Sequence, residues 1–436
     1  MLKIRLCLLV AFALLCVNAN AQRSAIDTYA ITNARIVTVS GPVIEHGTVV
    51  VRNGLIAAAG ANVNAPPDAR VIDGTGLTVY PGLIDSYTDL ALPEPAPSPS
   101  PGAGPPPRPA PGPNSTQPPG LQPEVMAEDV IRPGGNEIEA SRNTGITTAL
   151  TSPRTGIWMG QSALINLAGD TPQQMIVRSP VAMHVSFTPL RTGYPGSLLG
   201  VFSALRQMML DTQRYRDSLQ IYERAPRGTR RPDTDRSLAA LVPVIEGRMP
   251  VVMLANSERE ISRALDLATE FKLRLIIAGG READRVADRL AKQKVPVLLS
   301  LNLPKRTTAA IPEADPEPMR VLRERVEAQQ TAGKLAKAGV RFAFQSGSLT
   351  NMSDLMPNAG KTIENGLSAT DAVRAFTIWP AEILGVQNQL GSIEAGKIAN
   401  LTVVRGDLFD RNGRVTQVFI DGRPIDVKPA PESPKQ

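Results

Sequence analysis

The pattern of apolar and polar positions changes twice along the chain. Near both ends, short runs of β-branched residues are separated by turn residues, which is typical of strands joined by hairpins. Two of these turns are Asn53-Gly54 and Asp421-Gly422. Such pairs between apolar runs predict two-residue hairpin loops. We therefore expect residues 22–80 and 386–428 to pair into one small composite β-sandwich, which brings the two ends of the chain together.

Between these segments, short apolar runs alternate with amphipathic stretches of helical period. The apolar runs occupy residues 82–85, 145–150, 162–167, 181–187, 251–254, 273–278, 295–300 and 340–344. Helices are expected over residues 201–225, 257–271, 282–293 and 318–338. Strands that alternate with helices in this way predict an α/β fold, namely a TIM-type (β/α)8 barrel over residues 81–385.

Residues 1–21 have the organisation of a secretory signal peptide. A charged start is followed by an apolar run over residues 6–17 and by Ala19-Asn20-Ala21, a small-residue cleavage site. We expect this segment to be removed, so that the mature chain starts at Gln22 and is periplasmic or secreted. The apolar run is too short for a membrane span, and no later run reaches the roughly 18 apolar residues that a span requires.

The positions of the cysteines and the small net charge exclude several classes of function. Cys7 and Cys16 both lie in the predicted signal peptide, so the mature chain has no disulfide and no thiolate ligand or nucleophile. Loss of Lys3 and Arg5 lowers the formal net charge from +6 to +4. This surplus is small and is not gathered in a basic run. Nucleic-acid binding is therefore not expected.

One segment interrupts the barrel pattern. Residues 93–123 contain 14 of the 39 prolines. A segment of this composition cannot bury enough apolar surface to fold, so we expect a polyproline-like or disordered loop. It follows the first barrel strand, at the end where such barrels carry their active sites. It is either a tolerated surface insertion or a flap that binds a partner. Residues 429–436 are expected to be a disordered tail.

Four motifs, spread over nearly the whole mature chain, carry a family resemblance. They are residues 71–86, which include Pro-Gly-Leu-Ile-Asp-Ser, residues 145–150, residues 160–165, and residues 368–385 followed by 390–401. In this order they resemble the amidohydrolase superfamily, in the branch that contains imidazolonepropionase and secreted prolidase-like enzymes. The resemblance implies a TIM-type barrel with a β-sandwich. It also implies a metal-activated hydroxide that attacks a carbonyl or imine carbon and usually breaks a C–N bond.

The resemblance implies metal-ligand positions as well, and this chain has other residues there. The family's pair of histidines on the first strand falls on Tyr87 and Asp89. Its fifth-strand histidine falls on Leu254, and its sixth-strand histidine falls on Gly279. The eighth-strand aspartate, which is metal ligand and general base in the family, falls on Gly347. We therefore expect these residues to line a pocket without holding zinc.

The whole chain has two histidines. His46 precedes the strand at Gly47, and we expect it at the surface. His184 lies on the predicted fourth strand and is either a hydrogen-bonded core or rim residue or a pocket residue. A catalytic zinc typically takes three protein ligands, so one imidazole with Asp89 does not suffice.

Oxygen donors leave another possibility open. Asp85, Asp89, Asn256 and Ser346 lie at or near predicted strand ends, which meet at the mouth of a barrel. A hard cation such as Ca²⁺ or Mg²⁺ accepts donors of this kind. An altered, oxygen-rich site is therefore the alternative to a site without metal.

Three functions remain in competition. The first, which we favour, is a degenerate amidohydrolase without a cofactor that binds a small molecule or forms a homo- or hetero-oligomer with an active relative. The second is an active hydrolase of small amides, cyclic C–N compounds or dipeptides. Its catalytic candidates are Asp89, His184 and Tyr87, and its cofactor is zinc or another divalent cation. The third is an interaction protein whose binding element is the proline-rich loop.

Overall fold

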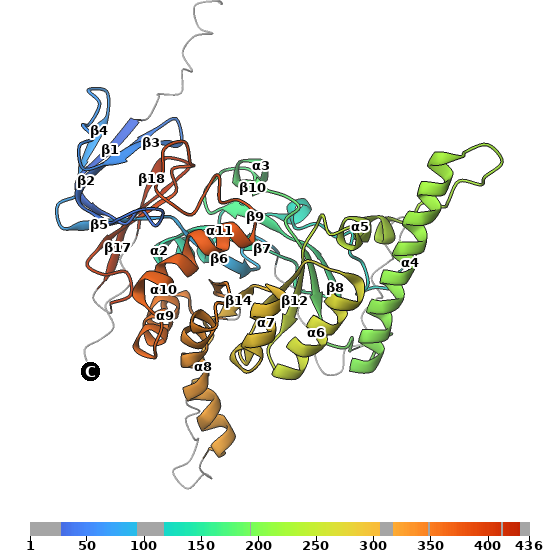
Figure 1. Cartoon of the computed structure of the whole chain (residues 1–436). Coiled ribbons are helices and arrows are strands. Elements are labelled where there is room, and N and C mark those ends of the chain that lie inside the picture. Colours follow the sequence, from blue (N-terminus) through green and yellow to red (C-terminus); the bar gives the residue numbers. More distant parts are fainter. Residues whose placement is uncertain are drawn as a thin grey trace, which may run out of the picture.

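The computed structural model describes residues 28–93, 117–191, 193–305, 317–347, 349–410 and 413–427 (Figure 1). The predicted signal peptide, most of the proline-rich segment and the predicted tail lie outside these residues. Among the described helices, none is both long enough and apolar enough to cross a membrane.

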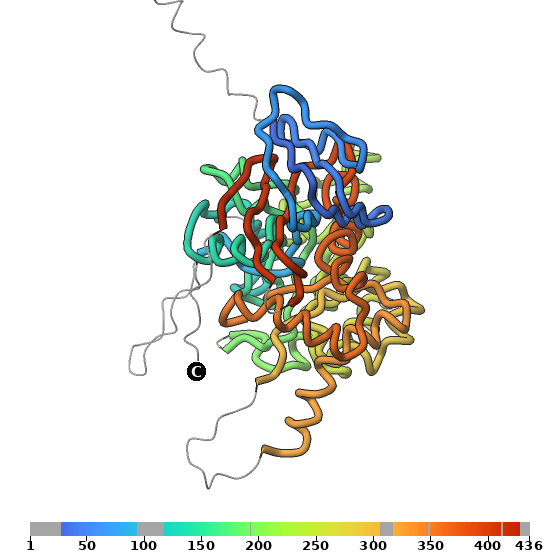
Figure 2. The backbone as a smooth tube through the Cα atoms, turned by 90° about the vertical axis from the view of Figure 1, so that its left-hand side faces the viewer, coloured from blue at the N-terminus to red at the C-terminus, as the bar shows by residue number. Residues whose placement is uncertain are grey.

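Strands from both ends of the chain form one eight-stranded sheet, seen in blue and red in Figures 1 and 2. Its members are β1 (Thr28–Ile36), β2 (Ile44–Arg52), β3 (Leu55–Gly60), β4 (Arg70–Asp73), β5 (Leu77–Pro81), β16 (Leu401–Arg405), β17 (Arg414–Ile420) and β18 (Arg423–Asp426). The order is β18-β17-β16-β5-β1-β2-β3, and β4 pairs with β1. The antiparallel pair of β5 and β16 joins the two ends, and hydrogen bonds thus connect the expected sandwich as a single sheet.

Both predicted hairpin turns are formed. Asn53 and Gly54 join β2 to β3 with φ values of 53° and 79°, and Asp421 and Gly422 join β17 to β18 with 50° and 74°. Positive φ at both central residues is the requirement of the type I′ turn, which explains these residue pairs. Gly422 also approaches Gly54 so closely that an added Cβ would lie 2.7 Å from the Gly54 Cα.

All eight apolar runs of the central region form strands, in two further sheets. One sheet has the order β10-β9-β7-β6 and the other β15-β14-β13-β12-β11-β8. The strands are β6 (Leu83–Thr88), β7 (Ile146–Thr151), β8 (Trp158–Gln161), β9 (Ala163–Asn166), β10 (Ile176–Arg178), β11 (Met183–Ser186), β12 (Val251–Ala255), β13 (Leu275–Gly279), β14 (Val297–Ser300) and β15 (Phe342–Gln345). β6 is parallel to β7, and β11 to β15 are parallel throughout.

The expectation of eight parallel barrel strands is wrong at the third one. β9 pairs antiparallel with β7. The segment between them holds β8 and no helix, and it is too short for the crossover of a dozen or more residues that a parallel pair needs. The paired strands also do not close into one continuous ring. A few hydrogen bonds outside the ladders link the two sheets. They include Val181 N to Ser162 O and Ser162 N to Ala182 O (both 2.9 Å) on one side, and Ser86 Oγ to Phe344 O (2.7 Å) on the other.

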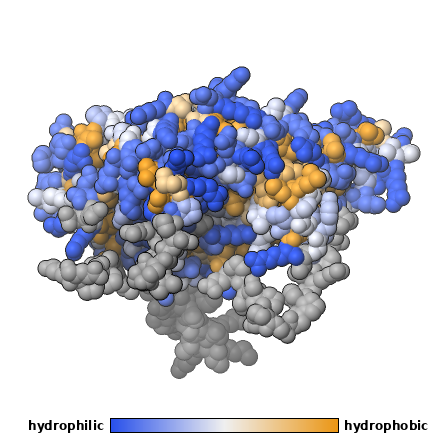
Figure 3. Space-filling model, turned by 90° about the horizontal axis from the view of Figure 1, so that it is seen from below, coloured by the Kyte–Doolittle hydropathy of each residue, from blue (hydrophilic) through white to orange (hydrophobic). Residues whose placement is uncertain are grey.

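Helices cover the outer side of these strands (Figure 1). They are α2 (Asn136–Asn143), α3 (Pro172–Met175), α4 (Leu198–Arg224), α5 (Arg236–Ile245), α6 (Glu258–Phe271), α7 (Ala287–Gln293), α8 (Met319–Lys337), α9 (Leu355–Glu364), α10 (Ala369–Phe376) and α11 (Ile378–Ile383). The helix expected over residues 282–293 begins instead as a 3₁₀ turn, Ala283–Val286. The ends of α4 and α8 project from the body, and the face seen from below is mostly hydrophilic with interspersed apolar patches (Figure 3).

Side chains along each strand of the central sheets point alternately into two apolar cores. On β11, Met183 and Val185 pack in the outer core with the helices. The opposite side of the strands forms a second cluster, the inner core, which includes Ile84, Leu150, Leu164, Ala182, Val252, Ile276, Leu298 and Ala343. Side chains at alternate positions of a strand point to opposite faces, so His184 belongs to the inner side. The inner core places the carboxyl ends of β6, β11, β12 and β15 around the candidate site.

Candidate functional site

The centre of the site is a stacked pair of rings, Tyr87 on β6 and His184 on β11. Their ring centroids are 5.4 Å apart, with an angle of 19° between the planes. Tyr87 is 5% exposed and His184 is fully buried. Burial lowers the pKa of His184 to about 3 and raises the pKa of Tyr87 to about 12. Both rings are therefore neutral throughout the physiological pH range.

Three buried polar atoms of this region have no hydrogen-bond partner. They are Nδ1 and Nε2 of His184 and Oε1 of Gln345. The amide nitrogen of Gln345 donates to the Leu298 carbonyl at 3.2 Å, so the side chain is held on its other side. Buried polar atoms without a partner cost stability unless a bound molecule or water satisfies them. His184 is thus a buried polar residue of the inner core, and the expectation that it is hydrogen-bonded within the protein is wrong.

A buried carboxyl group lies beside this pair. Asp85 is 1% exposed and accepts hydrogen bonds from the Ser346 backbone N–H (3.0 Å), from the Ser346 hydroxyl and from the Tyr87 N–H (3.3 Å). Burial raises the pKa of Asp85 to about 6, although the hydrogen bonds from Ser346 and the charge of Arg154 act in the opposite direction. The strand β6 therefore supplies a carboxyl group next to Gly347, the position of the family's eighth-strand aspartate.

Asp89 is directed elsewhere. Its carboxylate forms an ion pair with Arg154 at 3.0 Å, and the two side chains are 42% and 31% exposed. A cation at Asp89 would have to compete with this guanidinium. The expected convergence of Asp89 with the other oxygen donors is not observed, whereas Asp85 and Ser346 do meet.

The remaining predicted positions, Leu254, Gly279 and Gly347, lie close to neighbouring residues. Leu254 is partly buried against the inner core. At Gly279, where φ is 97°, an added Cβ would lie 2.4 Å from Oδ1 of Asn256. At Gly347 an added Cβ would lie 1.9 Å from Oε1 of Gln345. A histidine or an aspartate at either glycine would require its neighbour to move.

The donors that these residues present do not fit a zinc centre. In the described parts of the chain, no group of three or more histidine, cysteine, aspartate or glutamate side chains could hold a metal ion. His184 cannot be joined by the second histidine, because His46 is exposed on β2 in the terminal sheet. A catalytic zinc site with three protein ligands is therefore not formed by the described residues.

Sequence reasoning found part of this cluster. It singled out Tyr87, His184 and Ser346, and it considered Asp85 only as an oxygen donor. It missed Arg154 and Gln345. Both carried a usable signal, since Arg154 follows β7 and Gln345 ends β15, the two strands that flank β6.

Comparisons with known structures agree on the fold. An amidohydrolase from Thermotoga maritima MSB8 has a TM-score of 0.77 at 24% sequence identity, over 92% of this chain and 100% of that one. A Xaa-Pro dipeptidase with bound methionine in the active site has a TM-score of 0.55 at 14% identity, over 92% and 100% of the two chains. A prolidase complexed with N-methylphosphonate-L-proline has a TM-score of 0.55 at 17% identity, over 92% and 100%.

Sequence comparison relates part of the chain to known proteins. The profile of the Amidohydrolase family matches residues 246–425. N-acetylglucosamine-6-phosphate deacetylase of Haemophilus influenzae is 33% identical over 78 residues, so the match spans 18% of this chain and 19% of the deacetylase. The fold is that of amidohydrolase structures, which are TIM barrels with a β-sandwich domain. The chain thus shares its fold with amidohydrolase structures, and residues 246–425 are similar in sequence to the Amidohydrolase family.

Proposed function

We propose that this protein derives from hydrolases of C–N bonds and now binds a small molecule or a protein partner at its strand ends without a metal cofactor. The observation that carries the proposal is the stack of Tyr87 on His184. The first ligand position of the family is a buried phenol, and it packs against the one histidine of the inner side. Stacked neutral rings fill space where a ligand set would need open coordination positions.

Two further contacts support the proposal. The second ligand position, Asp89, is neutralised by Arg154. A longer side chain at Gly279 or Gly347 would require Asn256 or Gln345 to move. The strand ends are thus built from residues that contact one another, and the unpaired atoms of His184 and Gln345 offer hydrogen bonds to a bound molecule.

Metal content tests the proposal directly. The purified full-length protein would be incubated with zinc, manganese or calcium, desalted and analysed by inductively coupled plasma mass spectrometry. We expect less than about 0.1 metal ion per chain in every case. A stoichiometric metal that is lost in Asp85→Asn and retained in Asp266→Asn, an exposed carboxylate on α6, would overturn the proposal.

One observation favours a second candidate, an active hydrolase with an oxygen-rich site. Asp85 and Ser346 place a carboxyl group and a hydroxyl group together at the strand ends, and a pKa of about 6 suits a general acid or base. The related proteins include a deacetylase and a Xaa-Pro dipeptidase, so N-acetyl amino sugars and Xaa-Pro dipeptides are the substrates to test first. Hydrolysis that Asp85→Asn abolishes and Asp266→Asn retains would establish this candidate.

Location and assembly are also proposals. We propose export to the periplasm or the exterior, which the charged, apolar and small-residue pattern of residues 1–21 supports. Size-exclusion chromatography with multi-angle light scattering would test whether the chain forms the oligomer that a partner role predicts.

A further inference from the structure

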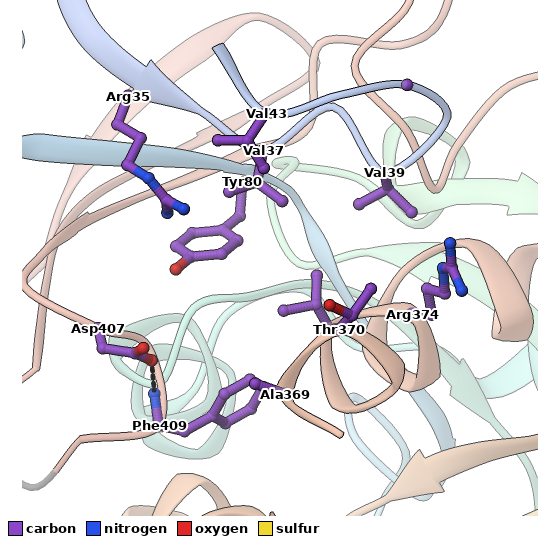
Figure 4. Close-up of a pocket in the computed structure, with 12 residues that line it drawn as sticks. Arg35, Val37, Val39, Val43, Tyr80, Ala369, Thr370, Arg374, Asp407 and Phe409 are labelled. Carbon is purple, nitrogen blue, oxygen red and sulfur yellow. Dashed lines mark hydrogen bonds between the residues drawn. The ribbon is translucent and has the colours of Figure 1, made fainter. Parts of the chain in front are cut away.

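A cavity lies away from the strand ends, between the terminal sheet and the helices (Figure 4). Its volume is about 200 Å³. The lining comes from β1 and the following turn, from β5, from one side of α10 and from the loop after β16. None of the residues discussed at the strand ends belongs to this lining, so the cavity is a separate site.

Much of the cavity wall is apolar, with Val37 and Val43 across the cavity from Phe409 (Figure 4). This apolar wall is formed by Val37, Val39, Val43, Ala369, Val373 and Phe409. Such a wall binds an aliphatic or aromatic group through burial of apolar surface. Pockets for drug-sized ligands are typically ~300–1,000 Å³, so a cavity of about 200 Å³ admits a smaller molecule.

Polar groups occupy two opposite ends of the cavity. At one end, Arg35 and Asp407 lie with the hydroxyl of Tyr80 (Figure 4), and the Arg35 guanidinium forms an ion pair with Glu45 at 3.1 Å. Burial and the neighbouring charge of Asp407 raise the pKa of Tyr80, so its hydroxyl remains a neutral hydrogen-bond donor. Asp407 is held in place, because its Oδ1 accepts from the Phe409 N–H at 2.9 Å.

The opposite end carries a positive charge. Arg374 lies there beside Val39 and Thr370 (Figure 4). Its side chain is 43% exposed, and its guanidinium pairs with Asp371 only at 3.5 Å. Ion pairs at this level of exposure are weak, so a ligand carboxylate can compete for the guanidinium.

The apolar wall includes a strained residue. Val39 has φ of 68°, a left-handed conformation that a β-branched side chain rarely adopts. The turn that holds it is fixed by Thr38, whose hydroxyl donates to the Pro42 carbonyl (3.2 Å) and accepts from the Gly41 N–H (3.1 Å). A glycine would meet the backbone requirement without strain, but only a side chain can complete the wall.

From these features we propose that the cavity is a binding site for a compact organic anion, a carboxylate with an apolar aliphatic or aromatic body. The carboxylate pairs with Arg374 and the hydroxyl of Thr370. The apolar body lies against the valines and Phe409, and the polar end at Tyr80 accommodates a polar substituent.

The test is titration of the full-length protein with phenylacetate, benzoate and hexanoate, each compared with its neutral amide, by isothermal calorimetry and saturation-transfer NMR. We expect at least one carboxylate to bind about tenfold more tightly than its amide, because only the carboxylate pairs with Arg374. Arg374→Gln should remove this preference. Arg206→Gln is the matched control, since Arg206 is also 43% exposed and paired with a carboxylate.

Two further variants separate this site from structural effects and from the strand ends. Val39→Gly should weaken carboxylate binding without lowering the urea midpoint, because it removes one side chain of the apolar wall together with the backbone strain at this position. Asp89→Ala should leave carboxylate binding unchanged. The proposal is overturned if none of the three carboxylates binds, if Arg374→Gln binds them as the unchanged protein does, or if binding depends on Asp89.

Discussion

Replacement of Asp85 by asparagine gives the most direct test of the electrostatics at the strand ends. The asparagine can keep the geometry, because its Oδ1 accepts from the Ser346 N–H and its amide N–H₂ can donate to the Ser346 hydroxyl. What disappears is the charge. In the unfolded chain the Asp85 carboxyl titrates at 3.8, and in the folded protein its pKa is about 6.

The direction in which pH changes the stability follows from the protons that Asp85 binds in the folded and unfolded states. Between these two pKa values the folded state holds a proton that the unfolded state has lost, so this carboxyl group makes the protein less stable as the pH rises from 3.8 to 6. The difference of about 2 pKa units corresponds to about 3 kcal/mol. Asp85→Asn should therefore raise the free energy of unfolding by up to about 3 kcal/mol at pH 7, and by close to zero below pH 4.

Urea unfolding at pH 7 and pH 4, followed by tryptophan fluorescence and circular dichroism, measures this difference. At each pH, the free energy of unfolding of the unchanged protein is subtracted from that of the variant. The contributions of all other titrating groups, His184 included, cancel in this difference. Asp266→Asn, which removes an exposed partner of Arg289, should change the free energy by less than about 1 kcal/mol at both pH values. An Asp85→Asn effect of the same size at pH 7 and pH 4 would refute the argument.

Three other substitutions test the structure. His184→Phe keeps a ring against Tyr87 and removes two unpaired nitrogens, so it should abolish an acid-induced loss of stability that reaches about 5 kcal/mol as the pH falls from 6.5 to 3. About 3 kcal/mol of this loss falls between pH 7 and pH 4, where urea unfolding measures it. An unchanged pH dependence would contradict this. Gly279→Ala should cost about 1–3 kcal/mol, more than Gly134→Ala, where φ is similarly positive but no atom lies within 4 Å of the added Cβ. Equal losses would mean that the contact with Asn256 has no effect. Ser257→Ala removes the capping box of α6 and should lower the free energy of unfolding, measured by calorimetry, by about 1 kcal/mol. No loss would show that Glu260 alone caps the helix.

Much of the fold follows from local patterns in the sequence. The eight apolar runs are strands because each buries both faces, between the helices and the inner core. Asn53-Gly54 and Asp421-Gly422 form turns because their backbone conformations suit few other residues. The direction of β9 was missed because an apolar run has no direction. Only the length of the connection from β7, which is too short for a crossover, distinguishes the two orientations.

The site was less predictable because it depends on side-chain contacts between distant strands. Tyr87 and His184 were both candidates, but nothing in their separation along the chain indicates that their rings stack. Asp85 reaches Ser346 across 261 positions, and the alternation within β6 does not show which neighbour its carboxylate meets. The pairing of Asp89 with Arg154 likewise appears only once β6 and β7 lie side by side.

The pairing of β5 with β16 also constrains how the molecule can be made. Until β16 has been synthesised, one edge of β5 exposes unpaired backbone groups that any extended chain can bind. The terminal sheet therefore closes last during vectorial synthesis or translocation, and its closure depends on a contact of very long sequence separation, which slows folding. A chain that stops before Leu401 would keep this open edge and its apolar side chains, and would be prone to self-association through them.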